Sequence, residues 1–212
     1  AFTGIDHVGL EACRAKGMQI CNAANYSNQT VAELVIGMTI DLLRHMDEAQ
    51  QRVHGGGTAA GLTGREIMGK TVGIIGLGNI GSRVASRMAG FEARLLGTDP
   101  CWPEALAAKY GIERRELNEL LAESDIVCVH CPLDETTAGF IGKAELALMK
   151  PSALLVNMAR GGIVDEDALY DALKANRICG AGLDVFQTEP PSPDDPLFQL
   201  PNVTVTPHNA AL

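Results

Sequence analysis

Three ionisable residues in the second half of this chain each follow a short apolar run, the position where α/β proteins commonly bind ligands. The residues are Arg160, Glu189 and His208, and the runs before them are 153–157, 178–184 and 203–205. A guanidinium binds a carboxylate through two hydrogen bonds, and an imidazole beside a carboxylate transfers protons near neutrality. Taken singly, such an arginine is usually in a surface ion pair, such a glutamate is usually a loop carboxylate, and such a histidine is usually solvated. Together they predict a site for a small acid that exchanges a proton.

A glycine-rich turn earlier in the chain predicts a dinucleotide site. Residues 76–81 read Gly-Leu-Gly-Asn-Ile-Gly, after a β-branched run and before a helical pattern. Gly76 allows the tight turn, Gly78 lets the backbone approach a phosphate, and Gly81 lets the helix pack close to the strand. The helix N-terminus favours the pyrophosphate anion. Asp99, at the end of the next apolar run, is suited to the ribose hydroxyls and repels a 2′-phosphate, which favours NAD over NADP.

These residues need a scaffold that brings strand ends together, and the pattern from Thr71 onward provides one. Apolar runs predict strands at 71–76, 93–98, 125–130, 153–157, 178–184 and 203–205. Helices are predicted between them at 79–90, 103–110, 116–122, 143–149 and 165–175. The runs are continuous rather than alternating, which is typical of strands covered on both faces. The fold class is therefore α/β, a doubly wound parallel sheet of the Rossmann type.

The first 64 residues do not continue this alternation. They predict a short helix at 9–16, a strand at 18–21 and a long helix at 30–53 that ends at a glycine-rich loop, 55–61. The start at Ala1 rather than Met is typical of a processed product or a fragment. We expect residues 1–24 to be the end of one domain and residues 25–212 to form an NAD-binding domain with a leading helix.

The charge and composition of the chain limit the kinds of partner and the location that we expect. The net charge is −9 and the sequence pI is near 5.0, which argues against nucleic acid as the main partner. No apolar run approaches a membrane span, and no signal peptide is visible. Six scattered cysteines predict a reduced, cytoplasmic protein. Cys128 and Cys131 have the spacing of a redox pair or half a zinc site, but no second pair completes four ligands, so we expect no metal.

Four extended motifs resemble those of the D-isomer-specific 2-hydroxyacid dehydrogenase family, over nearly the whole chain. They are Gly-Leu-Gly-Asn-Ile-Gly at 76–81, Asn-Met-Ala-Arg-Gly-Gly-Ile-Val-Asp-Glu at 157–166, Gly-Leu-Asp-Val-Phe at 182–186 with Glu189-Pro190, and Thr-Pro-His at 206–208. The resemblance implies hydride transfer between NAD and C2 of a D-2-hydroxy acid or 2-oxo acid. It implies that His208 is the acid–base, that Glu189 pairs with it, and that Arg160 binds the substrate carboxylate.

The resemblance and the glycine turn together imply the cofactor contacts. These are Thr3, Gly76, Gly78, Asn79, Ile80, Gly81, Asp99, Cys131, Met158, Ala159, Arg160, Asp184 and His208. The resemblance also implies that residues 1–24 are the remnant of a flavodoxin-like substrate domain, most of which is missing. It implies a homodimer formed through the 30–53 region.

Several alternatives stay open within this resemblance. The chain is similar to glycerate or hydroxypyruvate reductase-like members and to phosphoglycerate dehydrogenase-like members, with Asn25-Tyr26-Ser27 favouring the former group and D-lactate-type members. Formate dehydrogenase relatives carry Gln where this chain has Glu189. A different class of function is an NAD-binding module without turnover, either truncated or similar to NAD-sensing corepressors.

Overall fold

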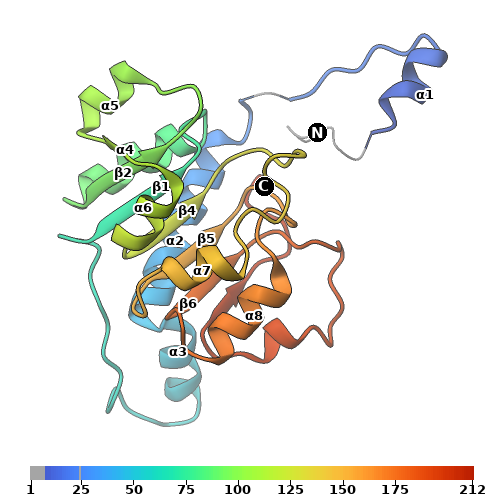
Figure 1. Cartoon of the computed structure of the whole chain (residues 1–212). Helices are drawn as coiled ribbons and strands as arrows, with labels where there is room; N and C mark the ends of the chain where they lie inside the picture. The colour runs from blue at the N-terminus through green and yellow to red at the C-terminus, as the bar shows by residue number, and fades with distance from the viewer. Residues whose placement is uncertain (1–7, 24) are drawn as a thin grey trace.

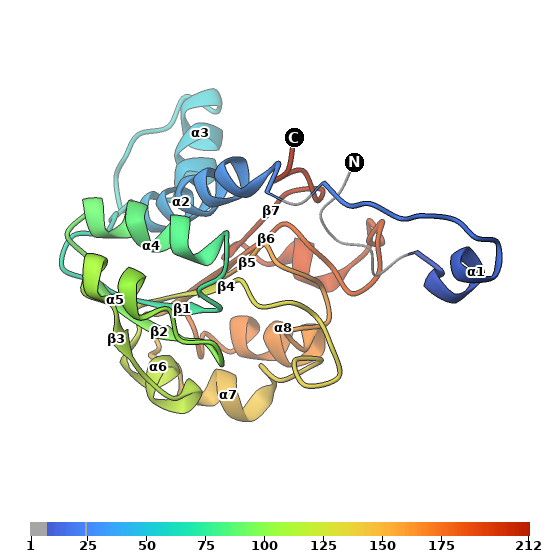
Figure 2. The ribbon, with the colours of Figure 1, turned by 90° about the horizontal axis from the view of Figure 1, so that it is seen from above.

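The computed structural model describes residues 8–23 and 25–212, and within these ranges seven parallel strands form one sheet. The strands are β1 (Thr71–Ile75), β2 (Arg94–Thr98), β3 (Glu113–Arg114), β4 (Ile126–Val129), β5 (Leu154–Asn157), β6 (Gly180–Leu183) and β7 (Val203–Val205). Their order is β3-β2-β1-β4-β5-β6-β7, so the strand order reverses between β1 and β4 (Figures 1 and 2). The doubly wound parallel sheet predicted from the apolar runs is confirmed.

Helices cover both faces of this sheet, and each face has its own buried cluster. On one face lie α2 (Asn28–Arg44), α4 (Gly81–Gly90) and α5 (Glu104–Tyr110), and on the other lie α6 (Leu117–Glu123), α7 (Lys143–Leu148) and α8 (Glu166–Lys174) (Figure 2). Alternate residues of each strand feed the two clusters: Val127 and Val129 of β4 face one, and Ile126 and Cys128 the other. Burial on both faces explains why the strands read as continuous apolar runs.

The strand predicted at 18–21 is wrong. Residues 18–21 pair with no strand, and the side chains of Met18 and Ile20 are 58% and 36% exposed. The helix before them, α1 (Leu10–Ala15), has no buried residue and lies at the end of an extended segment away from the sheet (Figures 1 and 2). An apolar stretch of four residues forms a strand only when a neighbouring strand satisfies its backbone groups.

The single helix predicted at 30–53 is two helices. α2 ends at Arg44, α3 (Met46–His54) follows, and His45 between them has φ +51°, in the left-handed region. The buried residues of α2 stop at Leu43, while α3 has none. Because the sequence of α3 is polar, this helix has no apolar face to pack against the sheet. It therefore need not continue in the direction of α2.

The sequence patterns missed β3, which pairs with β2 at the edge of the sheet through Glu113 and Arg114. Both residues are exposed, so the strand carries no apolar signal. Within the described ranges, no helix combines the length and the apolar character needed to cross a membrane.

Candidate active site

The loops that carry Arg160, Glu189 and His208 follow the carboxyl ends of three neighbouring strands, at the same end of the sheet. Strands β5, β6 and β7 pair in register, with Asn157 opposite Leu183 and Leu183 opposite Val205. These paired residues are the last of their strands. Ligands of open α/β sheets bind outside the carboxyl ends of the strands, so this end of the sheet is the candidate active site.

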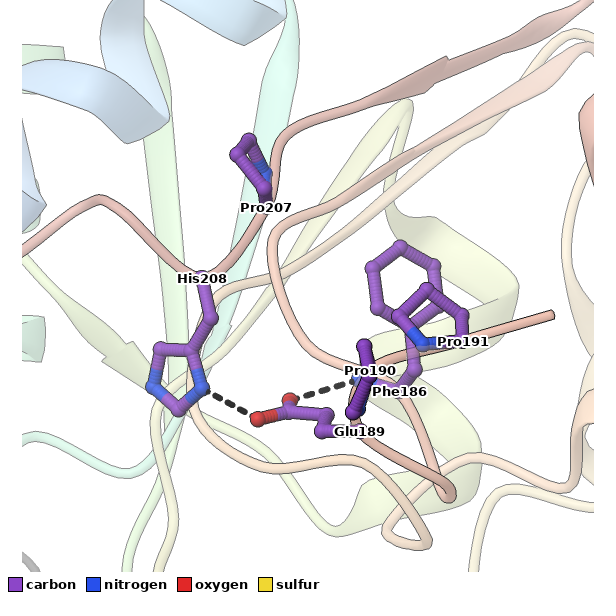
Figure 3. A pocket seen from close by; sticks show the side chains of 6 residues that line it. All are labelled: Phe186, Glu189, Pro190, Pro191, Pro207 and His208. Carbon is purple, nitrogen blue, oxygen red and sulfur yellow. Dashed lines mark hydrogen bonds and ion pairs between the residues drawn. The ribbon is translucent and has the colours of Figure 1, made fainter. Parts of the chain in front are cut away.

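His208 and Glu189 form a charge-assisted pair. The ring Nδ1 of His208 lies 2.6 Å from Oε2 of Glu189, and Oε1 of Glu189 accepts a hydrogen bond of 3.0 Å from the backbone N–H of Phe186 (Figure 3). With Nδ1 donating to the carboxylate, the lone pair lies on Nε2, on the ring side away from Glu189. Both side chains are about one third exposed. The pair thus has the geometry of an oriented general acid–base.

An apolar pocket adjoins this pair. It has a volume of about 330 Å³ and is lined by Phe186, Pro190, Pro191 and Pro207, together with the pair itself. Phe186, Pro190 and Pro191 lie on the Glu189 side of the pair, whereas Pro207 lies on the His208 side (Figure 3). The pocket therefore borders both members of the pair.

The loop that carries Arg160 is folded around a buried asparagine. Asn157, which is 2% exposed, donates from Nδ2 to the carbonyl of Arg160 (2.9 Å), and its Oδ1 accepts from the N–H of Ala159 (3.1 Å). Arg160 is half-buried, and its Nη1 donates to the carbonyl of Ala159 (2.7 Å). Sequence reasoning missed Asn157, although a single polar residue ending an apolar strand is a usable signal.

The loop that carries Arg160 packs closely against another loop at Gly161. A Cβ added to Gly161 would lie 2.0 Å from the backbone carbon and oxygen of Phe186. Gly161 therefore lets the Arg160 loop touch the loop that leads to Glu189. Gly162 has φ +78°, a left-handed backbone that favours glycine.

The glycine turn after β1 has the geometry that its motif predicts. Gly76 has φ +90°, and a Cβ there would lie 2.8 Å from the backbone of His130. A Cβ on Gly81 would lie 1.9 Å from the carbonyl oxygen of Gly76, so α4 packs tightly on the turn. By contrast, a Cβ on Gly78 would meet no atom within 4 Å. The turn is thus closed toward the protein and open at Gly78, which fits a dinucleotide pyrophosphate at the start of α4.

Asp99, which follows the end of β2, accepts a hydrogen bond from the backbone of this turn. Its Oδ2 accepts a 2.7 Å hydrogen bond from the N–H of Leu77, and its Oδ1 accepts one of 2.7 Å from the N–H of Cys101. The carboxylate is half-buried, so it has both a fixed orientation and an open side. This position fits the ribose contact expected of an acid about 20 residues beyond the glycine turn.

The other predicted cofactor contacts differ in accessibility. Asn79 and Ile80 lie at the start of α4, and the carbonyl of Asn79 accepts from Nη1 of Arg83 (2.6 Å). Cys131 and Ala159 are half-buried, at the ends of β4 and β5, whereas Met158 is 5% exposed. Thr3 lies outside the described residues.

Asp184, another predicted cofactor contact, is 1% exposed and has both carboxylate oxygens engaged. Oδ1 accepts from Oγ1 of Thr206 (2.6 Å) and from the N–H of Asn209 (2.9 Å), and Oδ2 accepts from the N–H of Ala210 (3.0 Å). Sequence reasoning did not single out Thr206. The carboxylate binds the segment that carries His208 from both sides.

Cys128 in β4 and the residues that follow this strand, His130 and Cys131, have pKa values shifted by burial. Burial raises the pKa of the Cys128 thiol to about 12 and that of Cys131 to about 11, which disfavours the thiolate. Both ring nitrogens of His130 are buried without a hydrogen-bond partner among the described residues, and burial lowers its pKa to about 4. In the described part of the chain, no three His, Cys, Asp or Glu residues are grouped to hold a metal ion.

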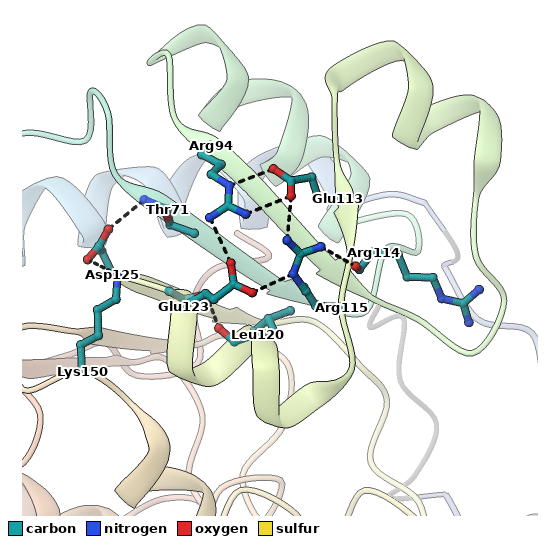
Figure 4. A network of polar contacts seen from close by, with 10 residues as sticks. Thr71, Arg94, Glu113, Arg114, Arg115, Leu120, Glu123, Asp125 and Lys150 are labelled. Carbon is teal, nitrogen blue, oxygen red and sulfur yellow. Dashed lines mark hydrogen bonds and ion pairs between the residues drawn. The ribbon is translucent and has the colours of Figure 1, made fainter.

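A closed network of charges links β2, the outermost strand β3 and α6. Arg94 contacts Glu113 (2.8 Å) and Glu123 (3.0 Å), and Arg115 contacts the same two carboxylates at 2.8 and 2.7 Å (Figure 4). Hydrogen bonding from Arg94, joined by Arg115, lowers the pKa of Glu113 to about 2. The network joins β2, the edge strand β3 and α6 at the amino ends of the strands, away from the candidate active site.

Comparison with known proteins places these features in a family. Residues 36–210 match the family model described as "D-isomer specific 2-hydroxyacid dehydrogenase, NAD binding domain". D-3-phosphoglycerate dehydrogenase of Methanocaldococcus jannaschii is 41% identical over 213 residues, which cover 100% of this chain and 40% of that protein. The chain thus spans less than half the length of this relative.

Solved structures agree with this match. The structure described as the pyruvate reductase of Chlamydomonas reinhardtii has a TM-score of 0.91 at 36% identity, covering 100% of this chain and 68% of that one. The D-lactate dehydrogenase from Aquifex aeolicus, complexed with NAD and lactic acid, has a TM-score of 0.89 at 34% identity, with coverage of 99% and 68%. The matched proteins bear several substrate names, so they assign no single substrate.

Proposed function

Because this chain belongs to the D-isomer-specific 2-hydroxyacid dehydrogenase family, we propose that it carries the cofactor-binding and acid–base parts of an NAD-dependent dehydrogenase. The enzyme acts on the CH–OH group of a D-2-hydroxy acid, or in reverse on the carbonyl of a 2-oxo acid. The observation that carries this proposal is the 2.6 Å contact between His208 and Glu189, on loops beside that of Arg160.

Each residue of the triad has a defined task in oxidation. Nε2 of His208 accepts the hydroxyl proton, while Glu189 orients the ring through Nδ1 and stabilises the imidazolium that forms. Arg160 binds the carboxylate and stabilises the negative charge on the C2 oxygen. The C2–H bond breaks with both electrons leaving as hydride, and a C2=O double bond forms. Bound NAD supplies the hydride acceptor, or the donor in reduction.

The proposed cofactor contacts are Gly76, Gly78, Asn79, Ile80, Gly81, Asp99, Cys131, Met158, Ala159, Arg160, Asp184 and His208, with Thr3 proposed from the sequence motif alone. The open face at Gly78 and the fixed carboxylate of Asp99 support this set. A carboxylate at the ribose repels a 2′-phosphate, so NAD is the proposed cofactor in preference to NADP.

We also propose an assembly and a location for the protein. A homodimer through the 30–53 region is supported by Met46 and Val53, whose side chains on α3 are 53% and 71% exposed. A cytoplasmic location is supported by the cysteines, all of which are free thiols in the described part of the chain. The proposed partner is a small 2-oxo or 2-hydroxy acid.

Oxidation of NADH with glyoxylate, hydroxypyruvate, pyruvate and 2-oxoisocaproate tests the activity. It is measured with the chain alone and with any longer polypeptide that contains it. His208→Gln should lower kcat by at least ~10²-fold at saturating NADH. An active His208→Gln variant would remove His208 from the mechanism. If no 2-oxo acid is turned over, the proposed dehydrogenase activity is refuted.

A second candidate function is an NAD-binding module without turnover. The open face at Gly78 and the fixed carboxylate of Asp99 support cofactor binding without requiring a hydride transfer, so they support this candidate as well. NAD binding by calorimetry, without NADH oxidation by the chain or by a longer polypeptide that carries it, would support this candidate.

A further inference from the structure

We propose that Thr206 is a positioning residue for His208, acting through the buried carboxylate of Asp184. The catalytic consequence rests on the proposed function, whereas the structural consequence does not. The Asp184 clamp comprises the Asp184 carboxylate with its three donors: the Thr206 hydroxyl and the N–H groups of Asn209 and Ala210.

The clamp holds the chain on both sides of His208. Thr206 precedes the histidine by two residues, and the two backbone donors are the first and second residues after it. Thr206 is also attached through its own N–H, which donates to the carbonyl of Leu183 (2.9 Å). Two consecutive residues of β6 and its exit, Leu183 and Asp184, therefore hold the backbone and the side chain of Thr206.

The conformation of His208 explains why a clamp is needed. Its φ is +51°, in the left-handed region that side chains with a Cβ seldom adopt. Such a conformation persists only where the surroundings over-determine it. The strand β7 has already ended at Val205, so sheet hydrogen bonds do not hold His208 itself. The clamp supplies the fixed points from which the ring reaches Glu189.

Within the clamp, the Thr206 hydroxyl is the one donor that a side-chain substitution removes without altering the carboxylate. Its hydrogen bond is short, 2.6 Å, and its acceptor is a carboxylate that is 1% exposed. Hydrogen bonds to charged acceptors are stronger than neutral ones, and a buried acceptor that loses its donor finds no water in exchange. Without the hydroxyl, Thr206 keeps only its backbone hydrogen bonds, so the segment that carries the His208 ring is held less firmly.

The test compares Thr206→Val with Thr206→Ser and with a matched control, Thr204→Val. Thr204 is in β7 on the same face of the sheet, and its hydroxyl donates to the carboxylate of Asp41 at 2.9 Å. The control therefore removes a threonine-to-carboxylate hydrogen bond of the same kind, at a place that does not touch His208. Thr206→Ser keeps the hydroxyl and should behave as the wild type.

Two readouts separate positioning from general stability. The first is the ¹⁵N resonance of His208 Nδ1 in the NMR spectrum of the chain, which reports its hydrogen bond to Glu189 and needs no turnover. The second is kcat, measured at saturating cofactor and 2-oxo acid. Thr206→Val should shift the Nδ1 resonance toward that of an unbonded imidazole and lower kcat by about 10- to 100-fold. Thr204→Val should change neither readout.

An unshifted Nδ1 resonance in Thr206→Val, with kcat as in the wild type, would overturn the proposal. The same would follow if Thr206→Ser failed to restore the resonance, or if Thr204→Val shifted it equally. Should Thr206→Val not fold, Thr206→Ala removes the hydroxyl without a new methyl group against the carboxylate, and carries the same expectations. A shifted resonance in a protein without any turnover would uphold the clamp and refute the proposed function.

Discussion

Replacing Gly161 by alanine should force apart the two loops that carry Arg160 and Glu189. The new Cβ would lie 2.0 Å from the backbone carbon and oxygen of Phe186, whereas ordinary contact begins at 3.4 Å, so the loops must separate by about 1.4 Å. Both obstructing atoms belong to the backbone, so no side-chain rotation relieves the contact. Glu189 moves with this backbone, because its Oε1 accepts from the N–H of Phe186.

The expected losses follow from this displacement. Overpacking of this kind costs about 1–3 kcal/mol of stability. A shift of about 1 Å between catalytic groups costs on the order of 10²-fold in rate, or about 2.7 kcal/mol in the barrier. Urea unfolding of Gly161→Ala should therefore show a lower midpoint, and NADH oxidation at saturating 2-oxo acid should show the loss in kcat.

Gly180→Ala is the matched control, since it crowds the backbone at the other end of β6. A Cβ there would lie 2.9 Å from the carbonyl oxygen of Asn202, away from the candidate active site. It should lower the unfolding midpoint and leave kcat per folded molecule unchanged. The reasoning is refuted if Gly161→Ala matches the wild type in kcat, or if Gly180→Ala loses as much activity.

Three further predictions concern the cofactor and the pH dependence of stability. Asp99→Asn places an amide where the N–H of Leu77 now donates, so NAD affinity measured by calorimetry should fall at least ~10-fold; unchanged affinity would contradict the ribose contact. Burial lowers the pKa of His130 from 6.5 to about 4, so the unfolded state binds the extra proton between these values. The free energy of unfolding should decrease by up to ~1.4 kcal/mol per pH unit as the pH falls through this window, and His130→Leu should abolish that slope in urea titrations. Because hydrogen bonding from Arg94 lowers the pKa of Glu113 from 4.5 to about 2, the charge network should be intact above pH 4.5 and lost as the pH falls toward 2; the urea midpoint of Arg94→Met should therefore change less than that of the wild type between pH 5 and pH 3.

Sequence patterns predicted the sheet well because its central strands are buried on both faces. Where burial gives no signal, prediction failed. The strand β3 consists of Glu113 and Arg114, which pair through the backbone and leave no apolar trace. The break between α2 and α3 depends on His45, a residue type with no strong preference for ending a helix. The opposite error occurs at residues 18–21, where an apolar pattern predicts a strand but no partner strand is present among the described residues.

The candidate site shows the same division. Its ionisable residues were predictable because each follows an apolar run, and the order of strands then brings the runs together. The features that shape the site depend on contacts between distant segments. Gly161 is crowded by residue 186, and Thr206 bonds to Asp184, 22 positions earlier. Sequence spacing does not reveal such contacts, because they depend on where loops leave the sheet and which way side chains point.

The pairing of β5, β6 and β7 has a consequence for how this family diversifies. The separation of the Arg160, Glu189 and His208 loops is set by backbone hydrogen bonds in one sheet, which tolerate changes in the side chains around them. Regions outside this sheet can therefore change while the relative positions of these three loops stay the same. Matched proteins named for phosphoglycerate, pyruvate and lactate chemistry, all resembling this one chain, are the diversity that such a separable arrangement permits.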